Sequence, residues 1–117
     1  MQKFLILFLT PVSVLENWMN TPEEERKAVE EKMKQEWDAW ITNNKSSIVD
    51  MPAGAGKTKL INTTGITDTK NDVMMYAVVQ ANSHEEAAKM FEGHPHLGIP
   101  EASIEVMTIN TLTGMNQ

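Results

Sequence analysis

The sequence predicts a single α+β domain over residues 1–110, and three observations lead to this prediction. Strand-like apolar runs and two amphipathic helices follow one another in the order β-α-β-hairpin-β-α-β. Both helices begin with the residue spacing of a capping box. The last segment, 103–109, alternates in polarity, as a strand does when one face lies on a core. Residues 111–117 are expected to form a flexible tail.

The first strand is predicted over Lys3–Leu9, where an apolar run of six residues ends at Thr10 and Pro11. This run is shorter than the apolar region of a signal peptide, roughly 7–15 residues, and lacks a clear cleavage site. It is also far shorter than the ~20 residues that span a bilayer. We therefore expect a buried strand, a cytoplasmic protein and no membrane partner.

One or two helical turns are predicted over Ser13–Met19, where Ser13 and Glu16 have capping-box spacing. A long helix follows. Thr21 and Glu24 form a capping box, and Pro22 suits the first helical position. Apolar side chains then recur at spacings of three and four residues along one stripe. These are Val29, Met33, Trp37, Trp40 and Ile41. The stripe places Trp37 on the inner side of the helix, as a core residue or a ligand-binding residue.

The second half of the chain is predicted to hold most of the strands. Val73–Ala81 is apolar on both faces, which is typical of a central strand. The second helix begins at Ser83 with Glu86 in capping-box spacing, and Gly93 suits a left-handed helix end. The other predicted strands are Ser46–Met51, a hairpin of Lys57–Asn62 and Ile66–Thr69 around Thr64-Gly65, and Ser103–Ile109.

This order of elements is the split βαβ, ferredoxin-like pattern with an extra hairpin. The two helices are expected to cover one face of the sheet and to leave the other face apolar and open. On a chain of 117 residues, an open apolar sheet face predicts pairing with a second copy. We therefore expect a homodimer.

Composition excludes several classes of function. The net charge of −6, from 16 acidic and 10 basic residues, repels phosphate backbones, so no nucleic-acid partner is expected. The absence of cysteine excludes disulfides and cysteine zinc sites. The run Gly54–Thr58 resembles the end of a nucleotide-binding P-loop, but Met51 stands where that motif needs glycine. A hairpin is also predicted where the motif needs a helix, so we reject nucleotide binding.

His94 and His96 flank Pro95 in the loop after the second helix. Histidine titrates near neutrality and suits acid–base chemistry or metal binding. The two residues are open to three interpretations: structural loop histidines, polar pocket residues, or metal ligands. A catalytic zinc site usually needs a third protein ligand. Glu105 or Asp68 could supply it, but no pattern in the sequence does so, and we predict neither a metal nor a cofactor.

Glu105 lies within the final apolar strand and has two interpretations. An alternating strand leaves one face wet, so the carboxylate can be solvated. Its face-mates Met107 and Ile109 are apolar, however, so a carboxylate that points into an intersubunit cavity with a raised pKa is an equally open interpretation.

Six short segments carry a resemblance to a known family: Ile48-Val49-Asp50, Gly65-Ile66-Thr67-Asp68, Tyr76-Ala77-Val78-Val79, Ser83-His84-Glu85-Glu86-Ala87, Gly93-His94-Pro95-His96-Leu97 and Ser103-Ile104-Glu105-Val106. With these segments the chain resembles the YciI-like, or DGPF-domain, family of small bacterial proteins. Two departures stand against this resemblance: Asp68 is followed by Thr69-Lys70-Asn71 instead of Gly-Pro-Phe, and no histidine precedes His84.

The resemblance implies a ferredoxin-like fold that dimerises through its sheets into a dimeric α/β barrel, with a pocket near the sheet and the subunit interface. Some members have a proposed His–Asp pair, and a few relatives act on small aromatic or chlorinated compounds. The early-helix histidine of the family has no counterpart in this chain, so that pair does not transfer.

Two functions remain as hypotheses. The first is a metabolite-binding or interaction module, favoured because acid–base groups are sparse. The alternative is a lyase or dehydrochlorinase, with His94 or His96 as general base. A cofactor-free monooxygenase or a haem protein is a third option. In the enzyme hypothesis, the base is oriented by Asp68 or Asp50, and a polar substrate group is bound by Glu105 or Tyr76.

Overall fold

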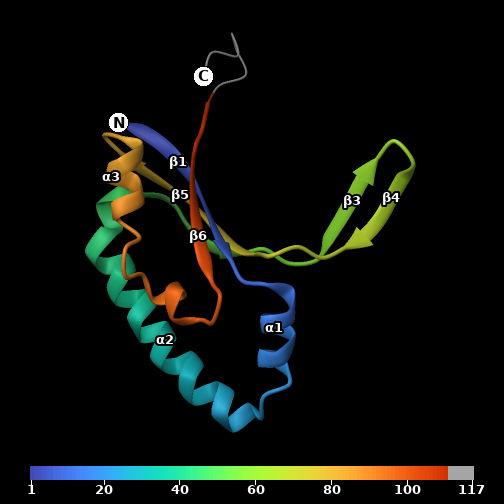
Figure 1. Ribbon diagram of the computed structural model, residues 1–117. Coiled ribbons are helices and arrows are strands. Elements are labelled where there is room, and N and C mark those ends of the chain that lie inside the picture. Colours follow the sequence, from blue (N-terminus) through green and yellow to red (C-terminus); the bar gives the residue numbers. More distant parts are fainter. Residues whose placement is uncertain (111–117) are drawn as a thin grey trace.

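The computed structural model describes residues 1–110, and an antiparallel sheet of four strands organises them (Figure 1). The sheet has the order β2-β5-β1-β6. Strand β1 (Gln2–Leu9) pairs with β5 (Val73–Ala81) and with β6 (Ser103–Thr108), and β2 (Ile48–Gly54) pairs with β5. This order confirms the predicted α+β, ferredoxin-like fold and the central position of β5. The predicted tail, 111–117, lies outside the described residues.

The second and third helices lie against one face of this sheet, and the first helix lies beyond the end of β1 (Figure 1). The helices are α1 (Val12–Met19), α2 (Glu23–Asn44) and α3 (His84–Lys89), with short 3-10 turns η1 (Lys45–Ser47) and η2 (Pro95–Gly98). The Trp40 indole on α2 donates a hydrogen bond of 3.1 Å to the carbonyl of Met90, so α2 and the end of α3 are tied together. Among the described residues, no helix combines the length and the apolar character needed to cross a bilayer.

Alternate side chains of β1 build the core beneath the helices. Phe4, Ile6 and Phe8 are fully buried, and Ala77 and Val79 of β5 join them. Burial of each large apolar side chain contributes about 1.5–3 kcal/mol. Trp37, Trp40, Ile104 and Val106 pack against this cluster from α2 and β6. The apolar stripe predicted on α2 therefore faces the sheet along the C-terminal half of that helix.

Within residues 1–110, no helix lies on the other sheet face (Figure 1). In the strand register, Leu5 lies between Val78 and Met107, and Leu7 lies between Tyr76 and Glu105. Asp50 of the edge strand β2 pairs with Val78. The predicted open face therefore exists, with apolar residues on its two central strands and carboxylates on its two edge strands. We call this surface the open face.

The predicted helix starts were wrong in detail. Helix α1 begins directly after Pro11, so Ser13 lies inside the helix and does not cap it. Helix α2 has Pro22 as its N-cap residue, with no side-chain cap. The Thr21 hydroxyl instead donates 3.1 Å to the carbonyl of Asn17 and so joins the end of α1 to the start of α2. The Ser83 cap was right, since its Oγ accepts from the backbone N–H of Glu86 at 3.1 Å.

Strands β3 (Thr58–Asn62) and β4 (Gly65–Thr69) form a separate two-stranded hairpin. Its turn is Thr63-Thr64, one residue earlier than predicted, and Asn62 Oδ1 accepts hydrogen bonds from Thr64. Because Thr58 begins a strand, the run Gly54–Thr58 does not lead into a helix, as a phosphate-binding loop must. The hairpin projects away from the four-stranded sheet (Figure 1).

Candidate functional site

The residues singled out by the sequence lie in three separate places. His94, His96 and Trp37 lie between the helices and the sheet. Asp50, Tyr76 and Glu105 lie on the open face, on the opposite side of the sheet. Asp68 lies on the hairpin. The sheet thus separates both histidines from Asp50 and Glu105.

His94 is buried in an aromatic cage. Its ring centroid lies 4.5 Å from that of Trp37, 4.6 Å from Trp40 and 5.3 Å from Phe8. Its Nδ1 accepts a hydrogen bond of 3.0 Å from the backbone N–H of His96 and so caps η2. A neutral ring with this acceptor carries its proton on Nε2, which has no hydrogen-bond partner among residues 1–110. The T-shaped contacts with the two indoles suit a weak N–H···π interaction.

His96 joins three parts of the fold. Its Nε2 donates a hydrogen bond of 2.9 Å to the carbonyl of Leu9 at the end of β1, and its ring lies edge-on to Phe8 at 5.5 Å. The residue belongs to η2, and its ring also interacts with the backbone of Ser103 at the start of β6. The ring therefore holds the loop between α3 and β6 against the end of β1.

Burial keeps both rings uncharged near neutral pH. Burial, assisted by the neighbouring His96, lowers the pKa of His94 from 6.5 to about 4. Burial also lowers the pKa of His96, while hydrogen bonds with the backbone of Leu9 and Ser103 offset part of that effect. Desolvation penalises the charged imidazole, which is the physical cause in both cases. The two histidines thus act as neutral hydrogen-bonding groups within the core.

The carboxylates singled out by the sequence, in contrast to the histidines, lie at the surface. Asp68 forms an ion pair of 2.6 Å with Lys59 across the hairpin, and both side chains are exposed. Asp50 and Glu105 are exposed on the two edges of the open face, and Tyr76 lies between them on β5. Across residues 1–110, no three histidine or carboxylate side chains gather as a metal site would require.

A concave site lies elsewhere, beyond the end of β1. A cavity of about 570 Å³ is enclosed by α1, the N-terminal half of α2, the start of β5 and the loop 98–101. Such volumes are ordinary for sites that bind small molecules, roughly 300–1,000 Å³. Its apolar lining residues are Val14, Leu15, Trp18, Val29, Met33, Met74, Ile99 and Pro100. Its polar lining residues are Thr10, Asn17, Thr21, Glu30 and Glu101.

This cavity contains few groups able to do acid–base chemistry. Neither His94 nor His96 lines it, and its two carboxylates, Glu30 and Glu101, are exposed. Glu101 has a φ of 60°, in the left-handed region that residues other than glycine seldom adopt. Strained backbone of this kind often accompanies binding sites. The lining suits binding of a mainly apolar molecule better than catalysis.

Thr10 is the buried polar residue of this cavity. It is 2% exposed, and its Oγ1 has no hydrogen-bond partner within residues 1–110. Its backbone N–H donates 2.8 Å to the carbonyl of Asp72, which holds the residue in place. A buried hydroxyl without a partner costs about 1–3 kcal/mol, so such groups need an explanation. A polar group of a bound molecule would provide the missing partner.

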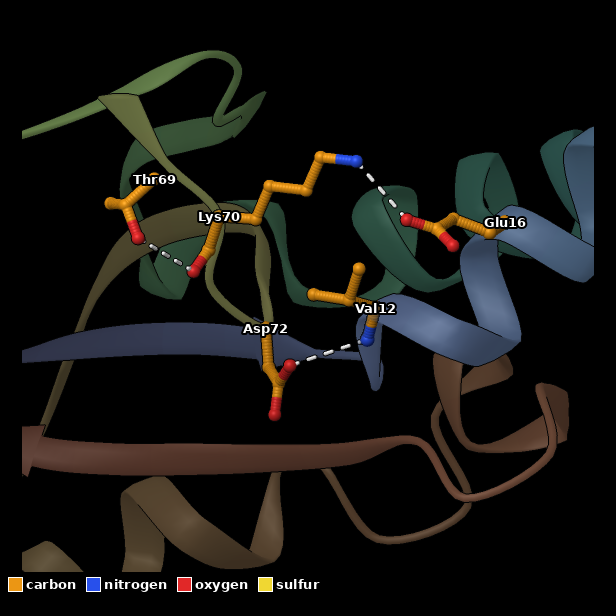
Figure 2. Close-up of polar contacts among 5 residues, drawn as sticks. All are labelled: Val12, Glu16, Thr69, Lys70 and Asp72. Atoms are coloured by element: carbon orange, nitrogen blue, oxygen red, sulfur yellow. Dashed lines mark hydrogen bonds and ion pairs between the residues drawn. The ribbon is translucent and has the colours of Figure 1, made fainter. Parts of the chain in front are cut away.

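A second cavity of about 310 Å³ adjoins the first, and both are lined by Thr10, Leu15 and Met74. The smaller cavity lies between α1 and the base of the hairpin. Figure 2 shows the polar contacts beside it: Lys70 forms an ion pair of 3.1 Å with Glu16, and the Val12 N–H donates 3.3 Å to Asp72 Oδ1. These contacts fix α1 as the wall between the two cavities.

Sequence reasoning missed Thr10, although the chain carries a signal for it. The buried face of β1 follows the period of two through Phe4, Ile6 and Phe8, and Thr10 continues it. A polar residue in phase with a fully buried strand face marks a buried hydroxyl. The rest of the cavity has no comparable signal, because its walls are separated by up to 91 positions in the chain, from Thr10 to Glu101.

Comparisons with known proteins add the following. No family model matches this chain, and no curated protein matches it. Among solved structures, the chain is similar to 5-chloro-2-hydroxyhydroquinone dehydrochlorinase from Burkholderia phenoliruptrix, in complex with 2,5-dihydroxybenzoquinone. The TM-score is 0.43 and the identity 18%, over 90% of this chain and 91% of that chain. A similarity this distant says nothing about the activity of this chain.

Proposed function

We propose that this protein is a cytoplasmic metabolite-binding module of the YciI-like type, with its binding site in the 570 Å³ cavity. The observation that carries the proposal is Thr10, a 2% exposed residue whose hydroxyl is unpaired within residues 1–110 and which lines that cavity. The ligand is a compact, mainly apolar molecule with one polar group. Its apolar part contacts residues such as Trp18 and Met33, and its polar group bonds with the Thr10 hydroxyl.

The sparse charge of the lining supports binding over chemistry. The two carboxylates, Glu30 and Glu101, are exposed and have no histidine beside them on the cavity wall. An acid–base enzyme needs a base within hydrogen-bond reach of the reacting proton, with a second group to orient that base. A binding module needs only an apolar wall and a few polar groups.

The alternative function, a lyase or dehydrochlorinase with histidine–carboxylate catalysis, ranks second for a geometric reason. Nδ1 of His94 is engaged with the backbone of His96, and Nε2 of His96 is engaged with the carbonyl of Leu9. The proposed orienting residues lie elsewhere, Asp68 on the hairpin and Asp50 on the open face. Catalysis by either histidine would first require these hydrogen bonds to break.

The proposal includes a homodimer formed through the open face. This face has the anatomy of an interface, with apolar Leu5, Leu7 and Val78 at its centre and Asp50 and Glu105 on its edge strands. A twofold axis would bring the same patch of each copy together. Two sheets facing each other in this way would form the dimeric α/β barrel implied by the resemblance.

A matched pair of probes tests the binding site: naphthalene, and 1-naphthol, which adds one hydroxyl to the same rings. We expect 1-naphthol to bind more tightly than naphthalene by about fivefold, as one neutral hydrogen bond provides. The Thr10→Val variant should lose this preference and still bind naphthalene. Without ligand it should be more stable than the wild type, because it removes an unpaired buried hydroxyl. Titration calorimetry and thermal unfolding measure both effects.

The control is Thr42→Val, which removes an exposed hydroxyl on α2 that lines neither cavity. It should keep the wild-type preference for 1-naphthol. Equal affinity of the wild type for the two probes, or an unchanged preference in Thr10→Val, would contradict the proposed role of Thr10.

A further inference from the structure

The β3–β4 hairpin stands apart from the rest of the fold. In the described part of the chain, its strands pair only with each other as a separate sheet, and nearly all of their residues are exposed. Figure 1 shows it projecting beyond the four-stranded sheet, on the side of the molecule away from α2. Strands of five residues extend it by about 17 Å. We call residues 57–70 the arm.

The arm carries large apolar side chains in water. Ile61 is 72% exposed and Ile66 is 65% exposed, and the two residues are directly opposite each other in the strand register. Leu60, on the other face of the arm, is 47% exposed. A two-stranded hairpin by itself is marginally stable in water, and three or more strands or a packing partner are normally needed. The arm therefore has the properties of an element that is completed by a partner.

The charge of the arm indicates which partner fits. The arm carries three lysines, Lys57, Lys59 and Lys70, and one acidic residue, Asp68, for a net charge of +2. The whole chain carries −6, so the remaining residues carry −8. A second copy of this chain therefore offers a surface of opposite sign to the arm.

The open face provides a specific surface for the arm. In the proposed dimer the partner's sheet covers Leu5, Leu7 and Val78 at the centre of this face. On the edge strand β6, Met107 is 46% exposed and matches the apolar pair Ile61–Ile66. Its edge strands carry Asp50 and Glu105, which are opposite in charge to the lysines of the arm. Lys59 and Asp68 lie opposite each other on the same arm face as the isoleucine pair and form an ion pair of 2.6 Å. The excess positive charge of the arm is therefore that of Lys57 and Lys70.

We infer that the arm of each protomer docks on a second copy of this chain, with Ile61 and Ile66 against the margin of the open face. Because a twofold dimer is reciprocal, the two arms form two equivalent contacts. The arm is thus a dimer clasp, and the acidic edges of the open face determine where it binds. This inference rests on the homodimer of the proposed function.

Sedimentation equilibrium of the full chain tests the clasp. The double variant Ile61→Ser/Ile66→Ser should raise the dimer dissociation constant at least tenfold, with an unchanged circular dichroism spectrum. The charge variant Lys57→Glu should weaken the dimer as well. Added salt should weaken the wild-type dimer more than it weakens the charge variant. The control variant is Met19→Ser. Met19 is an exposed apolar residue on α1 that lines neither cavity, so its substitution should leave the dimer dissociation constant unchanged.

The open-face variant Leu7→Lys separates the two claims. If Leu7→Lys yields monomers while the Ile61→Ser/Ile66→Ser variant dimerises within twofold of the wild type, the clasp is overturned and the dimer stands. If the wild type itself sediments as a monomer of 13.1 kDa at 100 μM, the dimer and the clasp are both overturned.

Discussion

At the scale of single residues, His94 shows why a buried histidine need not be catalytic. Its ring fills the space between Phe8, Trp37 and Trp40, and its Nδ1 caps the turn η2. Both tasks require a neutral ring, because a protonated Nδ1 would become a donor and lose the backbone N–H of His96. The lowered pKa of His94 is therefore a consequence of its structural role.

This role predicts a pH dependence of stability. The pKa of His94 is about 4 in the folded protein and 6.5 in its ordinary state, so between these values the unfolded chain binds more protons. The free energy of unfolding should therefore fall as the pH falls from 6.5 to about 4, by up to about 1.4 kcal/mol per pH unit for this group. The lowered pKa of His96 acts in the same direction. Urea unfolding at several pH values measures this dependence.

His94→Asn is the informative variant for this prediction, since asparagine can cap η2 through its side-chain oxygen but does not titrate. It should have a shallower loss of stability below pH 6.5 than the wild type. The cavity left by the smaller side chain should lower its stability at all pH values. A wild-type protein with pH-independent stability between 4 and 6.5, or a variant with the wild-type slope, would contradict the assigned role.

At the scale of elements, α1 depends on contacts from outside itself. It has no fully buried residue and no side-chain cap of its own. Asp72, sixty residues further along the chain, accepts from the first helical N–H through Oδ1, and Lys70 pairs with Glu16 (Figure 2). A carboxylate near a helix N-terminus is also favoured by the helix dipole. Because α1 separates the two cavities, the segment 70–72 helps to set the shape of the proposed site.

Asp72→Ala should therefore destabilise the protein by about 1 kcal/mol, the usual contribution of a side-chain cap. Asp72→Asn keeps an acceptor oxygen at the same position and should stay closer to the wild type. Urea denaturation of the two variants measures the difference. Equal stability of Asp72→Ala and Asp72→Asn would show that the 3.3 Å hydrogen bond to Val12 contributes little.

Most of the elements could be predicted from local patterns. The alternation of polarity located β6, and the apolar run located β5 with the bounds observed. Two details depended on distant residues. The strand β2 continues through Pro52 to Gly54 because β5 pairs with it there, and α1 starts at Val12 because Asp72 binds its N-terminus. No local pattern contains these partners.

At the scale of the whole molecule, the candidate site was harder to predict than the fold. Periodicity correctly placed Glu105 and Met107 on one face of the last strand, yet it could not show that His94 and His96 lie on the other side of the sheet. The loop between α3 and β6 determines that placement, and its path has no repeating pattern. The cavity was missed because α1, α2 and the loop 98–101 meet there only after folding.

The two-layer arrangement explains why a cavity lies at this place. The C-terminal half of α2 packs on the sheet through Trp37 and Trp40, whereas its N-terminal half passes beyond the sheet toward α1 (Figure 1). Val29 and Met33 therefore face the cavity instead of a strand, and Val29 remains 48% exposed. An apolar helix stripe without a sheet beneath it is suited to an apolar ligand.

The three tryptophans allow the most direct test of ligand binding in this cavity. Trp18 lines it, whereas Trp37 and Trp40 pack on the core and line neither cavity. In a titration with 1-naphthol followed by nuclear magnetic resonance of the indole N–H signals, we predict a saturable shift of the Trp18 signal with little change in the other two. A saturable shift of Trp37 and Trp40 without Trp18, or no saturable shift of any indole, would contradict the proposed site.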